Sequence, residues 1–106
     1  MKIIQAIIRP EKEKEVLNNL EKAGIPAFTR LDVTGRGRQR GIQIGAVRYD
    51  ELAKVWLLVI VKDDVLERAL ETIKIAARTG NPGDGKIFVS SLSESRTLRT
   101  RSNDKA

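Results

Sequence analysis

The apolar positions along the chain follow two different periods, and together they predict an order of elements that occurs twice. Residues 2–8 form a short apolar, β-branched run, and Pro10 suits the first turn of a helix. Within 11–23 the apolar residues recur at helical spacing, and Gly24 supplies the stop before an alternating strand at 27–33. The first half therefore predicts a strand, a helix and a second strand.

The second half of the chain repeats this plan. Residues 55–61 form another apolar run, Asp63 or Asp64 can cap a helix, and apolar side chains line one face of 66–77. Gly80 ends that helix, and a glycine-rich turn leads to a last strand at 86–91. Two halves of this kind predict an α+β fold, a ferredoxin-like βαββαβ sandwich with two helices on one face of a four-stranded antiparallel sheet.

A long segment, 34–52, separates the second and third predicted strands. Loops of this length in compact domains are usually functional or disordered. The segment begins Gly-Arg-Gly-Arg-Gln-Arg-Gly at 35–41, where glycines let a ligand approach the backbone and guanidinium groups can bind phosphate oxygens. Neither a Walker A loop nor a Rossmann fingerprint is present, since no helix or Lys-Ser/Thr pair follows. A solvated loop and an RNA-binding arginine–glycine segment remain open as alternatives.

Composition narrows the class of function. The chain has 106 residues, 41% of them hydrophobic and 32% charged, which is typical of one folded domain. It contains no cysteine and no histidine, so thiolate nucleophiles and the commonest general base are missing and an enzyme is not expected. The formal charge of +6 predicts an anionic partner. No apolar run is long enough to span a membrane and none resembles a signal peptide, so we expect a cytoplasmic protein without membrane insertion.

Two further segments carry glycine or basic residues at loop positions. Residues 79–86, Thr-Gly-Asn-Pro-Gly-Asp-Gly-Lys, join a helix to a strand and could form a concave run of amides that binds phosphate. Taken alone, a helix end followed by an Asp-Gly turn is the better interpretation. The tail at about 96–106 is basic, although tail arginines are usually only solvated. Three such segments on one small fold favour an anion site.

These motifs, together with the opening residues 1–10, closely resemble the PII signal-transduction family over nearly the whole chain. The resemblance implies a single PII-like domain over 1–106 with a long T-loop at about 37–53. It further implies a homotrimer that binds ATP or ADP in the clefts between neighbours, with 2-oxoglutarate held through a complex of Mg²⁺ and ATP. Each site would then be completed by two chains.

The resemblance also assigns roles to matching positions. Gln39 would ligate Mg²⁺ and touch 2-oxoglutarate, and Lys54 would pair with a carboxylate of 2-oxoglutarate. Stacked amides and guanidinium groups suit a polyphosphate, and a lysine suits a dicarboxylate. No catalytic residue is implied. The nucleotide-binding residues would be Thr29 near the base and, around the phosphates, Gly37, Arg38, Gln39, Gly83, Asp84, Gly85, Lys86 and Arg99.

Departures from typical bacterial members indicate a branch of the family. The loop is several residues shorter, and the tyrosine that those proteins uridylylate has no counterpart. The short loop and the Arg-Thr-Leu-Arg-Thr tail resemble PII proteins encoded beside nitrogenase genes. That branch implies direct inhibition of nitrogenase, relieved by 2-oxoglutarate and ATP, with a PII paralogue as a second partner and with Arg48 and Tyr49 as contacts.

Other functions remain as alternatives. Within the family, the chain could regulate an ammonium transporter or glutamine synthetase, although the shortened loop argues against the transporter. A basic nucleic-acid-binding ferredoxin-like domain would need aromatic residues paired on its sheet, and no such motif is present, so no nucleic acid is expected as a partner. An acylphosphatase-like enzyme shares the predicted fold, but fold does not determine function.

Overall fold

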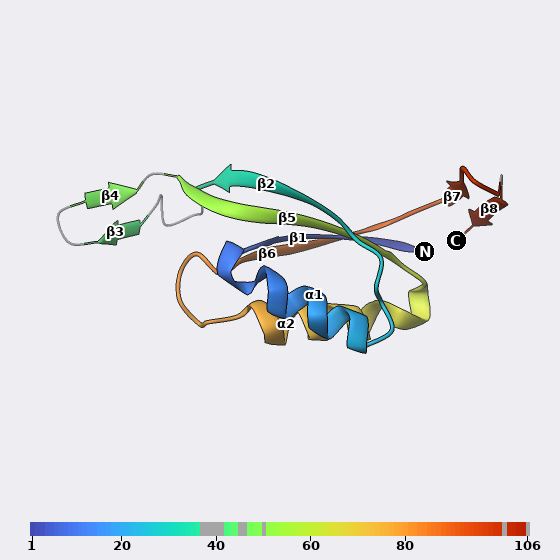
Figure 1. Cartoon of the computed structure of the whole chain (residues 1–106), viewed down its shortest axis with the longest axis horizontal. Helices are drawn as coiled ribbons and strands as arrows, with labels where there is room; N and C mark the ends of the chain where they lie inside the picture. The colour runs from blue at the N-terminus through green and yellow to red at the C-terminus, as the bar shows by residue number, and fades with distance from the viewer. Residues whose placement is uncertain (37–41, 45–46, 50, 101, 106) are drawn as a thin grey trace.

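A computed structural model of the chain describes residues 1–36, 42–44, 47–49, 51–100 and 102–105. Its main sheet has four antiparallel strands in the order β2–β5–β1–β6, and the helices α1 and α2 lie together on one face of it (Figure 1). The prediction of a ferredoxin-like sandwich is thus confirmed. The elements of this body are β1 Lys2–Ile8, α1 Glu13–Lys22, β2 Thr29–Gly35, β5 Leu52–Val61, α2 Leu66–Ala77 and β6 Gly85–Ser91.

The core lies between the sheet and the helices. Along β1, alternate side chains are buried, and Ile4, Ala6 and Ile8 face the helices. These three pair across the ladder with alternate residues of β5, which are buried as well. This alternation is the period of a strand with one covered face. The helices and the loop after α1 complete the core with Val16, Leu20, Ile25, Ala69, Ile73, Ala76 and Ala77.

The opposite face of the sheet remains apolar but uncovered by any described element (Figure 1). Register places Leu31, Trp56 and Ile7 in one row of this face, with Phe88 in the next row. Leu31 is 57% exposed and Phe88 53% exposed. The indole Nε1 of Trp56 donates to Gln5 Oε1 at 3.0 Å, so its polar atom is satisfied within the chain. A large exposed apolar face of this kind marks an interaction surface.

Several element boundaries differ from the prediction. Strand β5 begins at Leu52 instead of residue 55, because its ladder with β2 continues to the pair Gly35–Leu52. Two short 3₁₀ turns, Pro10–Lys12 and Asp63–Val65, precede the helices. The expectation that Asp63 or Asp64 caps the second helix is wrong, since the N-cap positions fall on neighbouring residues without side-chain caps. The Asp63 carboxylate instead pairs with the N-terminal amine at 2.9 Å.

Two hairpins extend from opposite ends of this body (Figure 1). The long loop contains β3 Ile42–Ile44 and β4 Val47–Tyr49, which pair with each other. The chain after β6 forms β7 Glu94–Thr97 and β8 Ser102–Lys105, a hairpin that the apolar pattern did not predict because its residues are mostly polar. Among the helices that the structure describes, none has the length and apolarity needed to cross a membrane.

Candidate functional site

The segment Thr79–Lys86, here called the phosphate loop, has a backbone that depends on glycine. Gly80, Gly83 and Gly85 all have positive φ, a region that side chains rarely adopt. At Gly85 an added Cβ would lie 1.7 Å from the carbonyl oxygen of Ile7, so the loop leaves α2 and enters β6 directly against β1. Helix α2 ends at Ala77, so the prediction that Gly80 ends it is wrong: the next residue, Arg78, is already extended. The loop is thereby fixed at the end of the sheet where β1 finishes.

The carboxylate of Asp84 organises this loop from inside. One oxygen, Oδ2, accepts hydrogen bonds from the backbone N–H groups of Thr79 at 2.9 Å and Gly80 at 2.8 Å. The other, Oδ1, accepts from the Thr79 hydroxyl at 2.5 Å and from Arg9 Nε at 2.9 Å. Burial alone would raise the pKa of Asp84, but these donors outweigh it and hold the pKa well below its usual value. Asp84 therefore positions the loop as a permanent anion.

Arg9 is a site residue that the sequence did not identify. It follows β1, and besides binding Asp84 its Nη2 donates to the carbonyl oxygen of Pro82 at 2.9 Å. The two residues of its ion pair are 75 positions apart in sequence, so no local pattern reveals the contact. A single arginine between a strand and a proline is the only local signal. Arg9 ties the end of β1 to both the backbone and the side chain of the phosphate loop.

The side chain of Lys54, on β5, also contacts the phosphate loop. This side chain is buried, and the ammonium group donates to the carbonyl oxygen of Gly83. Burial lowers the pKa of Lys54, and the charge of Arg9 lowers it further. Lys54 also pairs across the ladder with Val33, two residues before β2 ends at Gly35. The structure therefore brings Lys54 together with the phosphate loop and with the last residues of β2.

The phosphate loop retains donors that could bind an anion. In the described part of the chain, the N–H groups of Gly83 and Asp84 have no hydrogen-bond partner, and the Lys86 ammonium forms no ion pair. Positive-φ glycines that leave amides free are the basis of anion-binding concavities. No group of three acidic side chains in the described ranges could hold a metal by itself, so Mg²⁺ would need phosphate oxygens as additional ligands. These donors have the character of an anion-binding concavity.

Two predicted residues lie far from this loop. Thr29 begins β2, on the opposite edge of the sheet from β6. Arg99 lies beyond β6, whose seven residues span about 23 Å, and the end of β6 meets the start of β1 through a bond from Leu92 N to Met1 O of 3.0 Å. Figure 1 shows the hairpin that carries Arg99 at the end of the molecule opposite to the phosphate loop. One chain cannot bring these residues to the same ligand.

The remaining predicted residues fall partly outside the description. Gly37, Arg38 and Gln39 lie outside the described residues. For Arg48 and Tyr49 the backbone is described, and both belong to β4, where they pair with Gln43 and Ile42. Both residues therefore lie on the hairpin of the long loop, and their role as contacts stays a prediction.

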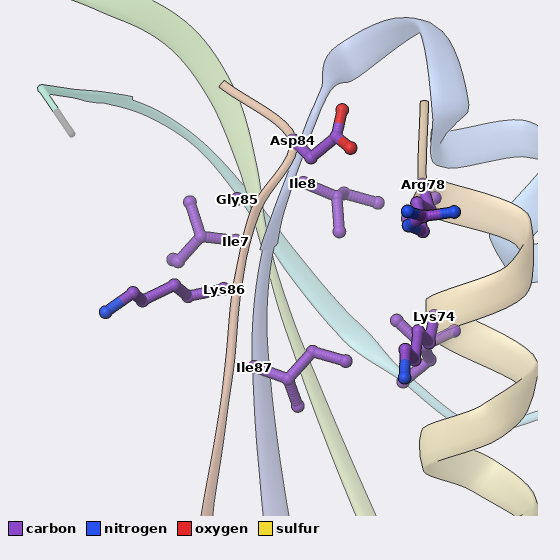
Figure 2. Close-up of a pocket in the computed structure, with 10 residues that line it drawn as sticks. Ile7, Ile8, Lys74, Arg78, Asp84, Gly85, Lys86 and Ile87 are labelled. Atoms are coloured by element: carbon purple, nitrogen blue, oxygen red, sulfur yellow. The ribbon is translucent and has the colours of Figure 1, made fainter. Parts of the chain in front are cut away.

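A groove of about 350 Å³ opens beside the phosphate loop, between β6 and α2 (Figure 2). Ile8 and Ile87 point toward α2, while Ile7 and Lys86 lie on the other side of the strands. Lys74 and Arg78 of the α2 end stand at its rim. A smaller hollow of about 200 Å³, lined in part by Ala27 and Ile60, lies near the start of β2.

Comparison with known proteins agrees with this arrangement. Residues 1–102 match the family model described as nitrogen regulatory protein P-II. A relative named nitrogen fixation nifHD region GlnB-like protein 1, from Methanothermococcus thermolithotrophicus, is 48% identical over 94% of this chain and 95% of its own length. The protein of that name from Methanococcus maripaludis is 50% identical, over 96% and 97% respectively. Nitrogen regulatory protein P-II 2 from Methanothermobacter thermautotrophicus is 45% identical, over 99% and 95%. The chain belongs to the PII family of nitrogen regulatory proteins.

Proposed function

We propose that this protein is a cytoplasmic sensor of nitrogen status that binds ATP or ADP and, with Mg²⁺ and ATP, 2-oxoglutarate. The observation that carries the proposal is the meeting of Lys54, Arg9 and the phosphate loop at the base of the long loop. A site next to the base of an extended hairpin can change that hairpin's conformation when a ligand binds. The protein then acts as a regulator and not as an enzyme.

In this proposal the phosphate loop binds the polyphosphate. The N–H groups of Gly83 and Asp84 and the ammonium of Lys86 donate to phosphate oxygens, while Arg9 acts through Asp84 to hold the loop in place. Gly37 and Arg38 bind phosphate at the base of the long loop, and Gln39 supplies a ligand to Mg²⁺. When bound, Mg²⁺ would favour oxygen ligands such as the side-chain carbonyl of Gln39 and would neutralise part of the phosphate charge.

Lys54 is the proposed partner of a 2-oxoglutarate carboxylate. A buried lysine with a lowered pKa gains more from a carboxylate than from a carbonyl, since an ionic acceptor forms the stronger hydrogen bond. Binding would then replace the bond from Lys54 to the Gly83 carbonyl. A change at Lys54 would therefore be communicated to the phosphate loop and to β2 beside it.

We further propose that the sites lie between subunits of a homotrimer. The uncovered apolar sheet face supports assembly, since such faces rarely remain in contact with water. The distance of Thr29 and Arg99 from the phosphate loop of their own chain supports a site in which a neighbour supplies both. The hollow near the start of β2 would then accept the base of the nucleotide.

The proposed target is nitrogenase, contacted directly through the hairpin of the long loop and its residues Arg48 and Tyr49. The support is twofold: the hairpin extends from the body (Figure 1), and several relatives are named for the nitrogen fixation nifHD region. A second PII protein is proposed as a further partner, consistent with the numbered names of the relatives. No nucleic acid or membrane is required.

Calorimetric titration tests the sensor function. Mg-ATP is titrated into the protein first, and 2-oxoglutarate is then titrated with and without nucleotide. We expect ATP to bind and 2-oxoglutarate to bind only when Mg-ATP is present. Lys54→Met should abolish the second binding, whereas Lys14→Met, at an exposed position of α1 with the same charge, should leave it intact. Failure of both ligands to bind the unmodified protein would refute the proposal.

Binding to the target is tested separately. Purified nitrogenase components are passed over immobilised protein with ADP, and again with Mg-ATP and 2-oxoglutarate. Retention with ADP and release with the second mixture is expected, and the paired substitutions Arg48→Ala and Tyr49→Ala should weaken retention. Equal retention of the variant would assign the contact to another surface.

A further inference from the structure

Leu98 is the most exposed large apolar side chain in the described part of the chain. It lies in the turn between β7 and β8, next to Arg99, and is 93% exposed. The hairpin pairs with itself and extends beyond the main body (Figure 1). A leucine that is fully exposed at a turn forgoes the favourable free energy of burying its side chain. Leu98 is therefore available for burial against a partner.

The groove beside the phosphate loop has an apolar floor, which suits an exposed leucine side chain. Its floor is formed by Ile8, Ile73, Ala77 and Ile87, all buried or partly buried members of the core or packed against it. Figure 2 shows Ile8 and Ile87 pointing into the space between β6 and α2. A volume of about 350 Å³ accommodates a leucine side chain with part of its backbone. The groove adjoins Asp84 and Gly85, so an occupant would lie directly beside the phosphate loop.

We propose that Leu98 of a second copy of this chain docks into the groove between β6 and α2 and thereby places Arg99 at the phosphate loop. The inference rests on the proposed function, in which Arg99 serves the site of a neighbour. The two residues are adjacent, so an anchor for one fixes the location of the other. Leu98 is thus a positioning residue for nucleotide binding.

Charge makes this docking dependent on the ligand. Lys74 and Arg78 at the rim form no ion pair within the described ranges, and the incoming hairpin brings Arg99. Like charges gathered at one site repel, and a bound anion of several charges removes that repulsion. The triphosphate is therefore the counterion that lets a basic hairpin dock against a basic rim. Docking of Leu98 and binding of nucleotide should strengthen each other.

Disulfide trapping tests the docking directly, because the chain contains no cysteine. The double variant Leu98→Cys/Ala77→Cys should form disulfide bonds between chains, seen as dimers and trimers on a denaturing gel without reductant. They should form faster with ATP than without. The control Leu98→Cys/Ile75→Cys places the second thiol two residues away on an exposed part of α2 and should not be trapped. Absence of trapping in a trimeric, ATP-binding double variant would overturn the docking. Equal rates with and without ATP would overturn the coupling.

An affinity measurement complements the trapping. Leu98→Ser should weaken ATP binding by roughly 10-fold, since an anchoring contact is lost although no phosphate donor is removed. Ile75→Ser, at another exposed apolar position, should leave the affinity unchanged. ATP affinity retained in Leu98→Ser would overturn the positioning role. If the unmodified protein does not bind ATP, the proposed function fails first, and trapping of Leu98 without nucleotide still decides the docking.

Discussion

The phosphate loop can be tested through Asp84, whose carboxylate accepts four hydrogen bonds from three residues. Asp84→Asn keeps the size of the side chain but replaces one acceptor oxygen by a donor. Whichever way the amide is oriented, two of the four donors then face an N–H₂ group. Hydrogen bonds to charged groups contribute about 1.5–3 kcal/mol each, and the side chain is partly open to solvent, so we expect a loss of about 2–4 kcal/mol.

Urea unfolding at one fixed protein concentration measures this loss, because the apparent stability of an oligomer depends on concentration. Hydrogen exchange should also show faster exchange at the N–H groups of Thr79 and Gly80. Asp64→Asn is the matched control, since Asp64 is exposed and forms no ion pair in the described part of the chain. An Asp84→Asn protein with unchanged stability and unchanged exchange at both amides would refute the role given to Asp84.

Three further results are expected. The pKa of Asp84 is depressed in the fold, so its contribution to stability is fully present above the unfolded pKa of about 3.9. This contribution is lost as the pH falls from there through the lower pKa of the folded state. Acid unfolding should show this loss, and the Asp84→Asn protein should lack it. Gly85→Ala should destabilise the protein by more than about 1 kcal/mol, since its Cβ would collide with the Ile7 carbonyl at a positive φ; chemical denaturation would show no change if the collision were relieved. Leu31→Asp should yield monomers in analytical ultracentrifugation, whereas Ile75→Asp should not, and an intact trimer would exclude the sheet face as the interface.

The arrangement of the main body could be predicted from sequence because two periods of apolar residues alternate and Gly24 ends the first helix. The same pattern could not locate the start of β5. Residues 52–54 include Lys54, whose charged side chain indicates a polar loop and not a buried strand. Its burial is explained only by the phosphate loop, whose Gly83 carbonyl accepts its hydrogen bond. A buried, charged lysine thus obscured the boundary of its own strand.

Some residues of the candidate site could be identified from the sequence and others could not, for a similar reason. The three glycines and the single lysine of the phosphate loop lie within one short segment, so their spacing is visible in the sequence. Arg9 contributes through a contact 75 positions away, and the hairpin of β7 and β8 has no apolar alternation to reveal it. Both depend on which strands become neighbours. That information is a property of the sheet order and not of any single segment.

The sheet order also explains why the proposed ligand and the proposed assembly belong together. Lys54, Arg9 and the phosphate loop occupy the end of the sheet where β1 finishes, and Arg99 lies past the end where β1 begins. A nucleotide held by the first group and by a neighbour's Arg99 bridges two chains, so its binding free energy is also a contribution to assembly. A single chain offers only part of the site, and its affinity should be correspondingly lower. Under the proposed function, the separation of these groups to opposite ends of a small domain would make sensing a property of the oligomer.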